Sequence, residues 1–173
     1  MDTLIEFAKI ILPAALVLYA MYLGIKIMID KELISQKAEI RGKSIEITLP
    51  VRLQAYERIC LFLERISPNN IVVRLNESGL SAREFHQKLL KDIRDEFNHN
   101  VSQQVYMTDD VWSKVITAKE DLITDLNATA EGMSEGETSI DFAKKLFERE
   151  MNKNIDPIRH AINSLKDEIS QTF

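Results

Sequence analysis

The stretch IILPAALVLYAMYLGI, residues 10–25, holds sixteen uncharged and almost wholly apolar residues between Lys9 and Lys26. A helix rises about 1.5 Å per residue, so roughly 20 such residues cross the ~30 Å hydrocarbon core of a bilayer. Lysines at both ends can extend their stems to the interface. The stretch therefore predicts a transmembrane anchor within residues 1–29. We expect the anchor to be formed by Ile10, Ile11, Leu12, Leu16, Val17, Leu18, Leu23 and Ile25.

Two other readings of this stretch fit less well. A cleaved signal peptide needs a basic start and small residues at the cleavage site. Here the first eight residues carry Asp2 and Glu6 without a Lys or Arg, and Lys26 stands where small residues are expected. A buried helix of a soluble protein would need apolar neighbours on all sides, which the rest of the chain does not supply. We favour the anchor.

Basic residues beside the anchor predict its orientation, because Lys and Arg resist translocation. The N-terminal side offers Lys9 alone, whereas the C-terminal side offers Lys26, Lys31, Lys37, Arg41 and Lys43. We therefore expect the N-terminus outside an inner membrane and the C-terminal domain in the cytoplasm. The single cysteine, Cys60, agrees with a reducing compartment, since secreted domains more often carry paired cysteines.

Two small residues in the predicted anchor, Ala20 and Gly24, are four positions apart. This spacing lets two membrane helices approach closely, although two ordinary small residues would give the same pattern. Pro13 is tolerated in a membrane helix and can kink it. The pair is a candidate contact between two anchors.

Beyond the anchor, the sequence predicts a juxtamembrane helix and connector over residues 30–48 and a cytoplasmic helical domain over residues 49–173. Gly42 is the expected end of the juxtamembrane helix, and Ser44–Thr48 alternates polar and apolar residues as an extended connector does. The net charge of −5 and the lack of a basic stripe argue against a nucleic-acid partner.

Apolar residues recur at helical spacing through the second part of the chain. Pro50 is expected to open its first helix, and Ile71–Leu75 fits either a short helix or a strand. Ser81 and Glu84 form a capping box, and Thr108 is an N-cap for the next helix. Residues 98–107 and 131–137 are expected to be loops. The predicted fold is all-α, with one N-terminal transmembrane helix followed by an antiparallel helical bundle of about four long helices.

The last helical stretch carries a near-heptad pattern from residue 147 to residue 169. Asp156-Pro157 interrupts it, so a kink or two abutting helices are expected there. The pattern is either the core face of the bundle or a coiled-coil contact with a partner or a second copy. The residues of this candidate partner-binding seam are Met151, Ile155, Ile158, Ile162, Leu165 and Ile169.

No pattern of residues in the sequence indicates a catalytic centre or a cofactor. Glu96 and His99 have the spacing of a metal-binding pair on one helix face. A di-iron site of that kind needs a second such pair and two further glutamates, and the chain has three histidines without a second Glu-x-x-His. We therefore expect no metal, no cofactor and no catalytic residue.

The segment LPVRLQAYERICLFLERISPNN, Leu49–Asn70, resembles an uncharacterised family of bacterial proteins associated with the Bacteroidota. Nearly the whole chain shares the order of segments of that family. The resemblance implies an inner-membrane protein with one N-terminal anchor and a helical domain, and it implies no activity.

The sequence thus favours a non-enzymatic, membrane-anchored interaction domain that acts as an accessory or scaffold subunit. Its expected partners are membrane lipid and a protein partner or a second copy. Two alternatives remain: an enzyme or ligand-binding domain whose site is assembled from scattered residues, and a structural protein that self-assembles through its anchor and C-terminal seam.

Overall fold

The computed structural model describes the backbone of residues 2–172 and most of their side chains, those at residues 2–10, 12–14, 34, 35, 37, 38, 40–45 and 172 excepted. The described backbone is helical apart from its connections and a single bridge between residues 81 and 138. The all-α class is therefore confirmed. In chain order the helices are α1 (Asp2–Ile66), α2 (Pro68–Leu75), α3 (Ala82–Asn100), η1 (Val101–Tyr106), α4 (Asp109–Glu131), α5 (Ser139–Met151) and α6 (Pro157–Thr172).

The chain divides into two compact units, Met1–Leu49 and Pro50–Phe173. The first unit is helical, and every described side chain from residue 15 to residue 33 is exposed. Within the described part of the chain, no helix reaches the combined length and hydropathy that a membrane crossing requires. The side chains of Ile10 and Leu12, which belong to the predicted anchor, lie outside the described residues.

The connector predicted at Ser44–Thr48 is wrong, because its backbone is helical and belongs to α1. Gly42 does not end a helix, and Pro50 lies inside α1 instead of opening it. Five residues of alternating polarity are too few to separate a strand from a helix. A glycine inside a helix costs only about 1 kcal/mol, which neighbouring helical residues offset.

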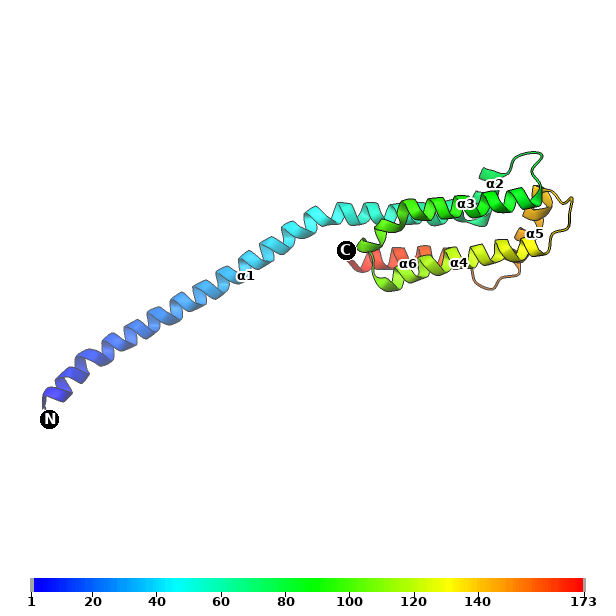
Figure 1. Cartoon of the computed structure of the whole chain (residues 1–173). Helices are drawn as coiled ribbons and strands as arrows, with labels where there is room; N and C mark the ends of the chain where they lie inside the picture. The colour runs from blue at the N-terminus through cyan, green and yellow to red at the C-terminus, as the bar shows by residue number, and fades with distance from the viewer. Residues whose placement is uncertain (1, 173) are drawn as a thin grey trace. The chain divides into compact units, whose positions relative to one another are not determined.

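The second unit is an antiparallel bundle formed by the end of α1 from Pro50 onward, α3, α4 and α6, which alternate in direction (Figure 1). Helix α4 packs against α3, α5 and α6, and α5 also packs against α3 and the short helix α2. The segment 71–75, whose sequence fits either a helix or a strand, is helical. The N-cap residue of α2 is Ser67, whose side chain does not bond to the amides of that helix. The Ser67 hydroxyl donates instead to the carbonyl of Glu64 at 2.8 Å.

Large apolar side chains from all these helices meet in one core, and aromatic rings join its layers. Phe62 of α1 lies 5.9 Å from Phe97 of α3, which stacks on Trp112 of α4 at 5.8 Å. Phe85 and Phe142 meet edge to face at 5.9 Å. Fully burying a ring, as at Phe62, Phe85 and Phe142, contributes roughly 1.5–3 kcal/mol to folding. The largest fully buried side chains also include Tyr56, Ile59, Leu63, Ile66, Ile71, Leu89, Ile93, Leu126 and Leu146.

Beyond α1, the helix boundaries predicted from the sequence are confirmed, with one exception. Thr108 accepts from the amide of Val111 as the N-cap of α4, and α5 and α6 are separate helices with Pro157 at the start of the second. The exception is the loop predicted at residues 98–107. There α3 runs to Asn100, whose amide group donates to the carbonyl of Glu96 at 2.8 Å, and η1 follows directly. Short 3₁₀ turns need only i→i+3 bonds, so polar residues do not prevent them.

A single carboxylate, that of Glu168 on α6, joins three elements at the end of the bundle where the second unit begins. Its oxygens accept from the Tyr56 hydroxyl at 2.5 Å, the Thr108 hydroxyl at 2.6 Å and the Thr108 amide at 3.1 Å. Arg52 donates to the Tyr56 hydroxyl at 2.9 Å and lies 3.7 Å from the carboxylate. Burial, followed by the bond to Glu168, raises the pKa of Tyr56. The side chain of Glu168 is only 10% exposed, so these donors replace water.

Replacing this carboxylate tests its contribution to stability. We expect Glu168→Ala to lower the free energy of unfolding by about 2–3 kcal/mol, because it leaves the buried Tyr56 hydroxyl without its acceptor. Urea denaturation followed by circular dichroism measures the change. Glu148→Ala, at an exposed position on α5, is the matched control and should stay within about 0.5 kcal/mol of the unchanged chain. Equal loss in both variants would contradict this role.

Candidate functional site

Two capping boxes meet at the other end of the bundle. Ser81 and Glu84 cap α3 reciprocally, as predicted, and Thr138 and Asp141 cap α5 in the same way. The two cap residues face each other in an antiparallel bridge. The amide of residue 82 donates to the carbonyl of residue 137, and the amide of residue 139 donates to the carbonyl of residue 80, both at 3.0 Å. We call this arrangement the double cap.

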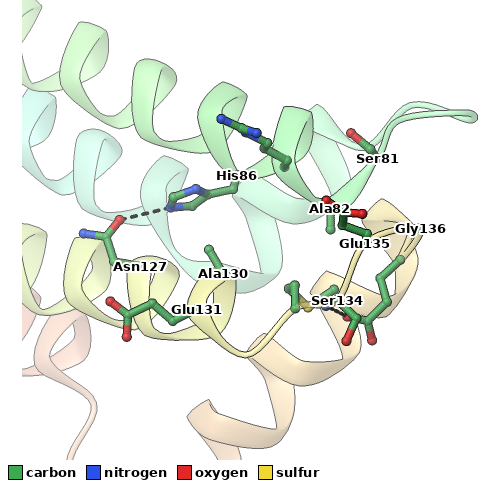
Figure 2. Close-up of a pocket in the computed structure, with 12 residues that line it drawn as sticks. Ser81, Ala82, His86, Asn127, Ala130, Glu131, Ser134, Glu135 and Gly136 are labelled. Atoms are coloured by element: carbon green, nitrogen blue, oxygen red, sulfur yellow. Dashed lines mark hydrogen bonds between the residues drawn. The ribbon is translucent and has the colours of Figure 1, made fainter.

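A hollow of about 720 Å³ opens beside the double cap. The first turns of α3, the last turns of α4 and the loop after α4 line it (Figure 2). Its apolar floor includes Ala82, Ala130 and Met133, and polar groups stand around it. This volume lies within the usual 300–1,000 Å³ range for a small-molecule site. The hollow is therefore one candidate binding site.

His86 and Asn127 form the polar pair of this hollow. In Figure 2 the imidazole of His86 points from α3 toward the side-chain amide of Asn127 on α4, and Nε2 lies 3.0 Å from Oδ1. With an amide oxygen as the acceptor, Nε2 is the donor of this hydrogen bond. The ring also packs 5.9 Å from Phe142. These contacts hold the imidazole in place, and sequence patterns did not reveal the pair because α3 and α4 supply one residue each.

The loop that closes the hollow is held by a lysine. Lys145 of α5 donates to the carbonyl of Gly132 at 2.8 Å and to the carboxylate of Glu137 at 2.9 Å. The amide of Ser134 donates to the same carboxylate. The backbone bond from Ser134 and the bond from Lys145 lower the pKa of Glu137. Bonds to their cap partners likewise lower the pKa values of the other two carboxyls at this end, those of Glu84 and Asp141.

The residues examined for catalysis are not assembled with one another. Glu96 forms an ion pair with Arg65 at 2.6 Å, and His99 is exposed near the end of α3. Burial, followed by the charge of Glu64, raises the pKa of the Cys60 thiol, which disfavours the reactive thiolate. In the part of the chain that the structure describes, no three His, Cys, Asp or Glu side chains are grouped to hold a metal ion.

The candidate seam divides between core and surface. Ile158, Ile162 and Leu165 are buried in the bundle core, and Ile169 is partly buried against it. The first two residues lie outside, with Met151 85% exposed and Ile155 70% exposed. The division follows from the break between α5 and α6. Residues 152–156 are not helical, so the six side chains do not share one face of a continuous helix.

Two further hollows flank the link between α5 and α6, and Ile155 and Lys153 line both. One, of about 420 Å³, lies beside the start of α2 and the end of α5. The other, of about 610 Å³, lies between α4 and α6. We call the residues 151–156 and these two hollows the linker face. The sequence pattern placed Met151 and Ile155 in the candidate seam but does not indicate the hollows, which form only where four helices pack.

Lys153 fixes the linker to the bundle. Its ammonium group bonds to Asp125 of α4 and to Glu150 of α5, the latter at 2.7 Å. Burial lowers the pKa of Lys153, but the two bonds outweigh it and raise the pKa above its ordinary value. The linker face is therefore held in one conformation by charge-assisted bonds.

The remaining candidate residues lie in the first unit. The described anchor residues are exposed by between 38% and 67%. Around Gly24, an added Cβ atom would meet nothing within 4 Å, and Ala20 is exposed as well.

Comparison with known protein families gives a match over nearly the whole chain. Residues 2–172 match a family described as a family of unknown function (DUF7935). The resemblance to an uncharacterised family, inferred from Leu49–Asn70, is confirmed at that level. No curated protein and no solved structure matches the chain.

As pH falls, we expect the double cap to lose its hydrogen-bonded structure at a higher pH than the bundle core does. Glu84, Glu137 and Asp141 have lowered pKa values in the folded chain, so their stabilisation is complete above the unfolded pKa values and is lost as pH falls through the folded ones. We expect hydrogen exchange at the amides of residues 82 and 139, corrected for intrinsic rates, to lose protection over this acid range.

Variants that cannot titrate provide the comparison. In the triple variant Glu84→Gln, Glu137→Gln, Asp141→Asn, the acceptor oxygens remain, and the loss of protection in acid should be shallower. A control variant with Asp95→Asn and Glu148→Gln, at exposed positions, should follow the unchanged chain. Identical acid profiles for the triple variant and the unchanged chain would contradict this explanation.

Proposed function

The chain belongs to the DUF7935 family of unknown function, and we propose that it is a membrane-anchored, non-enzymatic interaction domain. In this proposal, one N-terminal helix holds the protein in a bacterial inner membrane. The bundle lies on the cytoplasmic side and binds another protein as an accessory or scaffold subunit.

The proposed membrane anchor rests on the exposed apolar surface of the first unit. Leu16, Val17 and Leu18 are consecutive, so they point to different sides of α1, and they are exposed by 64%, 61% and 67%. A helix that is apolar on every side needs an apolar surrounding, which lipid supplies. Ile10–Ile25 carries no charge in the sequence, although Ile10 and residues 12–14 lie outside the described side chains.

The orientation in the proposal comes from the basic residues that follow the apolar stretch. The charges of residues 1–49 balance, with six basic and six acidic residues, so the net charge of −5 belongs to residues 50–173. An acidic domain is repelled by an anionic membrane surface, which leaves its faces open to proteins. The bundle thus suits binding of a partner better than lying flat on lipid.

The interaction role rests on the linker face. Met151 and Ile155 are large, apolar and exposed, and hollows adjoin them. Exposed apolar groups that adjoin a concave surface are typical of protein interaction sites. The alternative function, a ligand-binding domain, is favoured by the hollow that contains His86 and Asn127.

Charged substitutions in the middle of the apolar stretch test the anchor. We expect the double variant Val17→Asp, Leu18→Asp to move most of the full-length chain from the membrane pellet to the supernatant after alkaline carbonate washing. Each aspartate costs about 2.5–3.5 kcal/mol at the centre of a membrane helix. Leu33→Asp, at an exposed position beyond the stretch, is the control and should leave the chain in the pellet. If the unchanged chain is itself washed off, the proposal fails.

The orientation has a test of its own. A peptide tag after Phe173 should resist protease added to intact spheroplasts and be digested once the spheroplasts are lysed. Positive residues are retained on the cytoplasmic side, so protection of the tag is the expected result. Digestion of the tag in intact spheroplasts would show the opposite topology.

A further inference from the structure

We propose that the linker face binds a basic amphipathic helix of a partner protein, an inference that rests on the proposed function as an interaction domain. Three properties of this surface lead to it: exposed apolar side chains, hollows beside them, and an excess of negative charge.

The apolar side chains lie where the chain leaves one helix and begins the next. Met151 is the last residue of α5 and Ile155 precedes α6, and they are 85% and 70% exposed. Ile158, one helical turn further, is only 6% exposed. The link thus takes two residues of an apolar pattern out of the core and presents them to solvent. Methionine adapts its shape to different partners and is frequent on helix-binding surfaces.

The hollows lie on both sides of Ile155. The smaller one, of about 420 Å³, is lined by Pro68 and Phe147, and the larger one, of about 610 Å³, is lined by Pro157 and His160. Side chains three or four residues apart on a helix are about 5–6 Å apart and share one face. A helix lying across the linker can therefore place one apolar side chain on each side of Ile155.

The surface is already ordered before a partner arrives. Lys153 stands between the hollows and is bound to Asp125 and Glu150, on two different helices. A surface held in this way loses little conformational freedom on binding. Binding therefore does not require the partner to order this surface first.

Charge selects the occupant. Four carboxylates line the two hollows, against the two ammonium groups of Lys114 and Lys153, which leaves two negative charges in excess. Lys114 is also paired, at 2.6 Å, with Asp110 outside the lining. A partner helix with Lys or Arg beside its apolar face complements this rim. The four carboxylates are those of Asp121, Asp125, Glu150 and Asp156.

The excess negative charge of the linker face disfavours two other occupants, a second copy of the chain and an anionic lipid surface. A second copy that offered its own linker face would oppose like charges, and an anionic lipid surface would meet the same repulsion. A basic protein segment gains from the rim and fills the hollows with its apolar side chains.

Two defined peptides test the inference. They are helices of 18 residues with the same leucine face, one with lysine and one with glutamate at the polar positions, and each carries one benzophenone side chain for photocross-linking. The full chain is held in nanodiscs of zwitterionic lipid, and mass spectrometry locates and counts the cross-links. We expect the lysine peptide to cross-link to the linker face, with at least tenfold more product there than the glutamate peptide gives.

Variants of the chain locate the binding. The double variant Met151→Gln, Ile155→Gln should lower the yield of the lysine peptide at least fivefold, whereas Ile140→Gln, at an exposed apolar position elsewhere on α5, should not change it. Asp121→Asn with Asp156→Asn should lower it at least threefold. Asparagine at 156 keeps an oxygen for the Arg159 amide, which Asp156 now caps at 3.0 Å.

Several outcomes would overturn the inference. They are equal yields from the two peptides, no effect of the Met151 and Ile155 substitutions, and cross-links that avoid the linker face. A dimer of the chain, or binding to anionic vesicles, that disappears in the same double variant would assign the face to a second copy or to lipid instead. The double variant should stay in the membrane after carbonate washing, so failure here is distinct from failure of the anchor.

Discussion

The carboxylate of Glu168 links three helices, α1, α4 and α6, at one end of the bundle. It accepts hydrogen bonds from the first helix through Tyr56 and from the N-cap of α4 through Thr108, while itself belonging to the last helix. These elements are as far as 112 residues apart in the chain. Apolar packing brings helices together without fixing their order along the axis, whereas directional bonds to one buried charge fix both rotation and height.

The opposite end of the bundle is ordered by a different means. There the double cap joins the start of α3 to the start of α5 by two backbone bonds, and Lys145 holds the loop that leads from α4. Most of these groups are exposed, so water competes for them. One end of the bundle is thus tied through a buried carboxylate, and the other through exposed caps that depend on ionised carboxyls. The hollow with His86 and Asn127 lies at the second, less protected end.

Two groups of exposed apolar residues lie in different surroundings. In the first unit, exposed apolar side chains lie on different sides of α1, which accords with the proposed anchor in lipid. On the bundle, Met151 and Ile155 lie beside hollows with an acidic rim. A uniform apolar coat and a small apolar patch with charges around it require different surroundings. The proposed lipid anchor and the proposed basic partner helix fit these two surfaces separately.

The sequence by itself determined the helical class, the Ser81 and Thr108 caps and the break before Pro157, because each depends on residues within a few positions of one another. Local pattern misjudged Ser44–Thr48 and residues 98–107, where short polar segments fit more than one backbone. Only the tertiary structure decided which seam residues are buried, that Glu168 joins distant helices, and that hollows form beside Ile155. These properties arise where helices distant in sequence meet, and helical periodicity names the apolar face of each helix but not the partner that covers it.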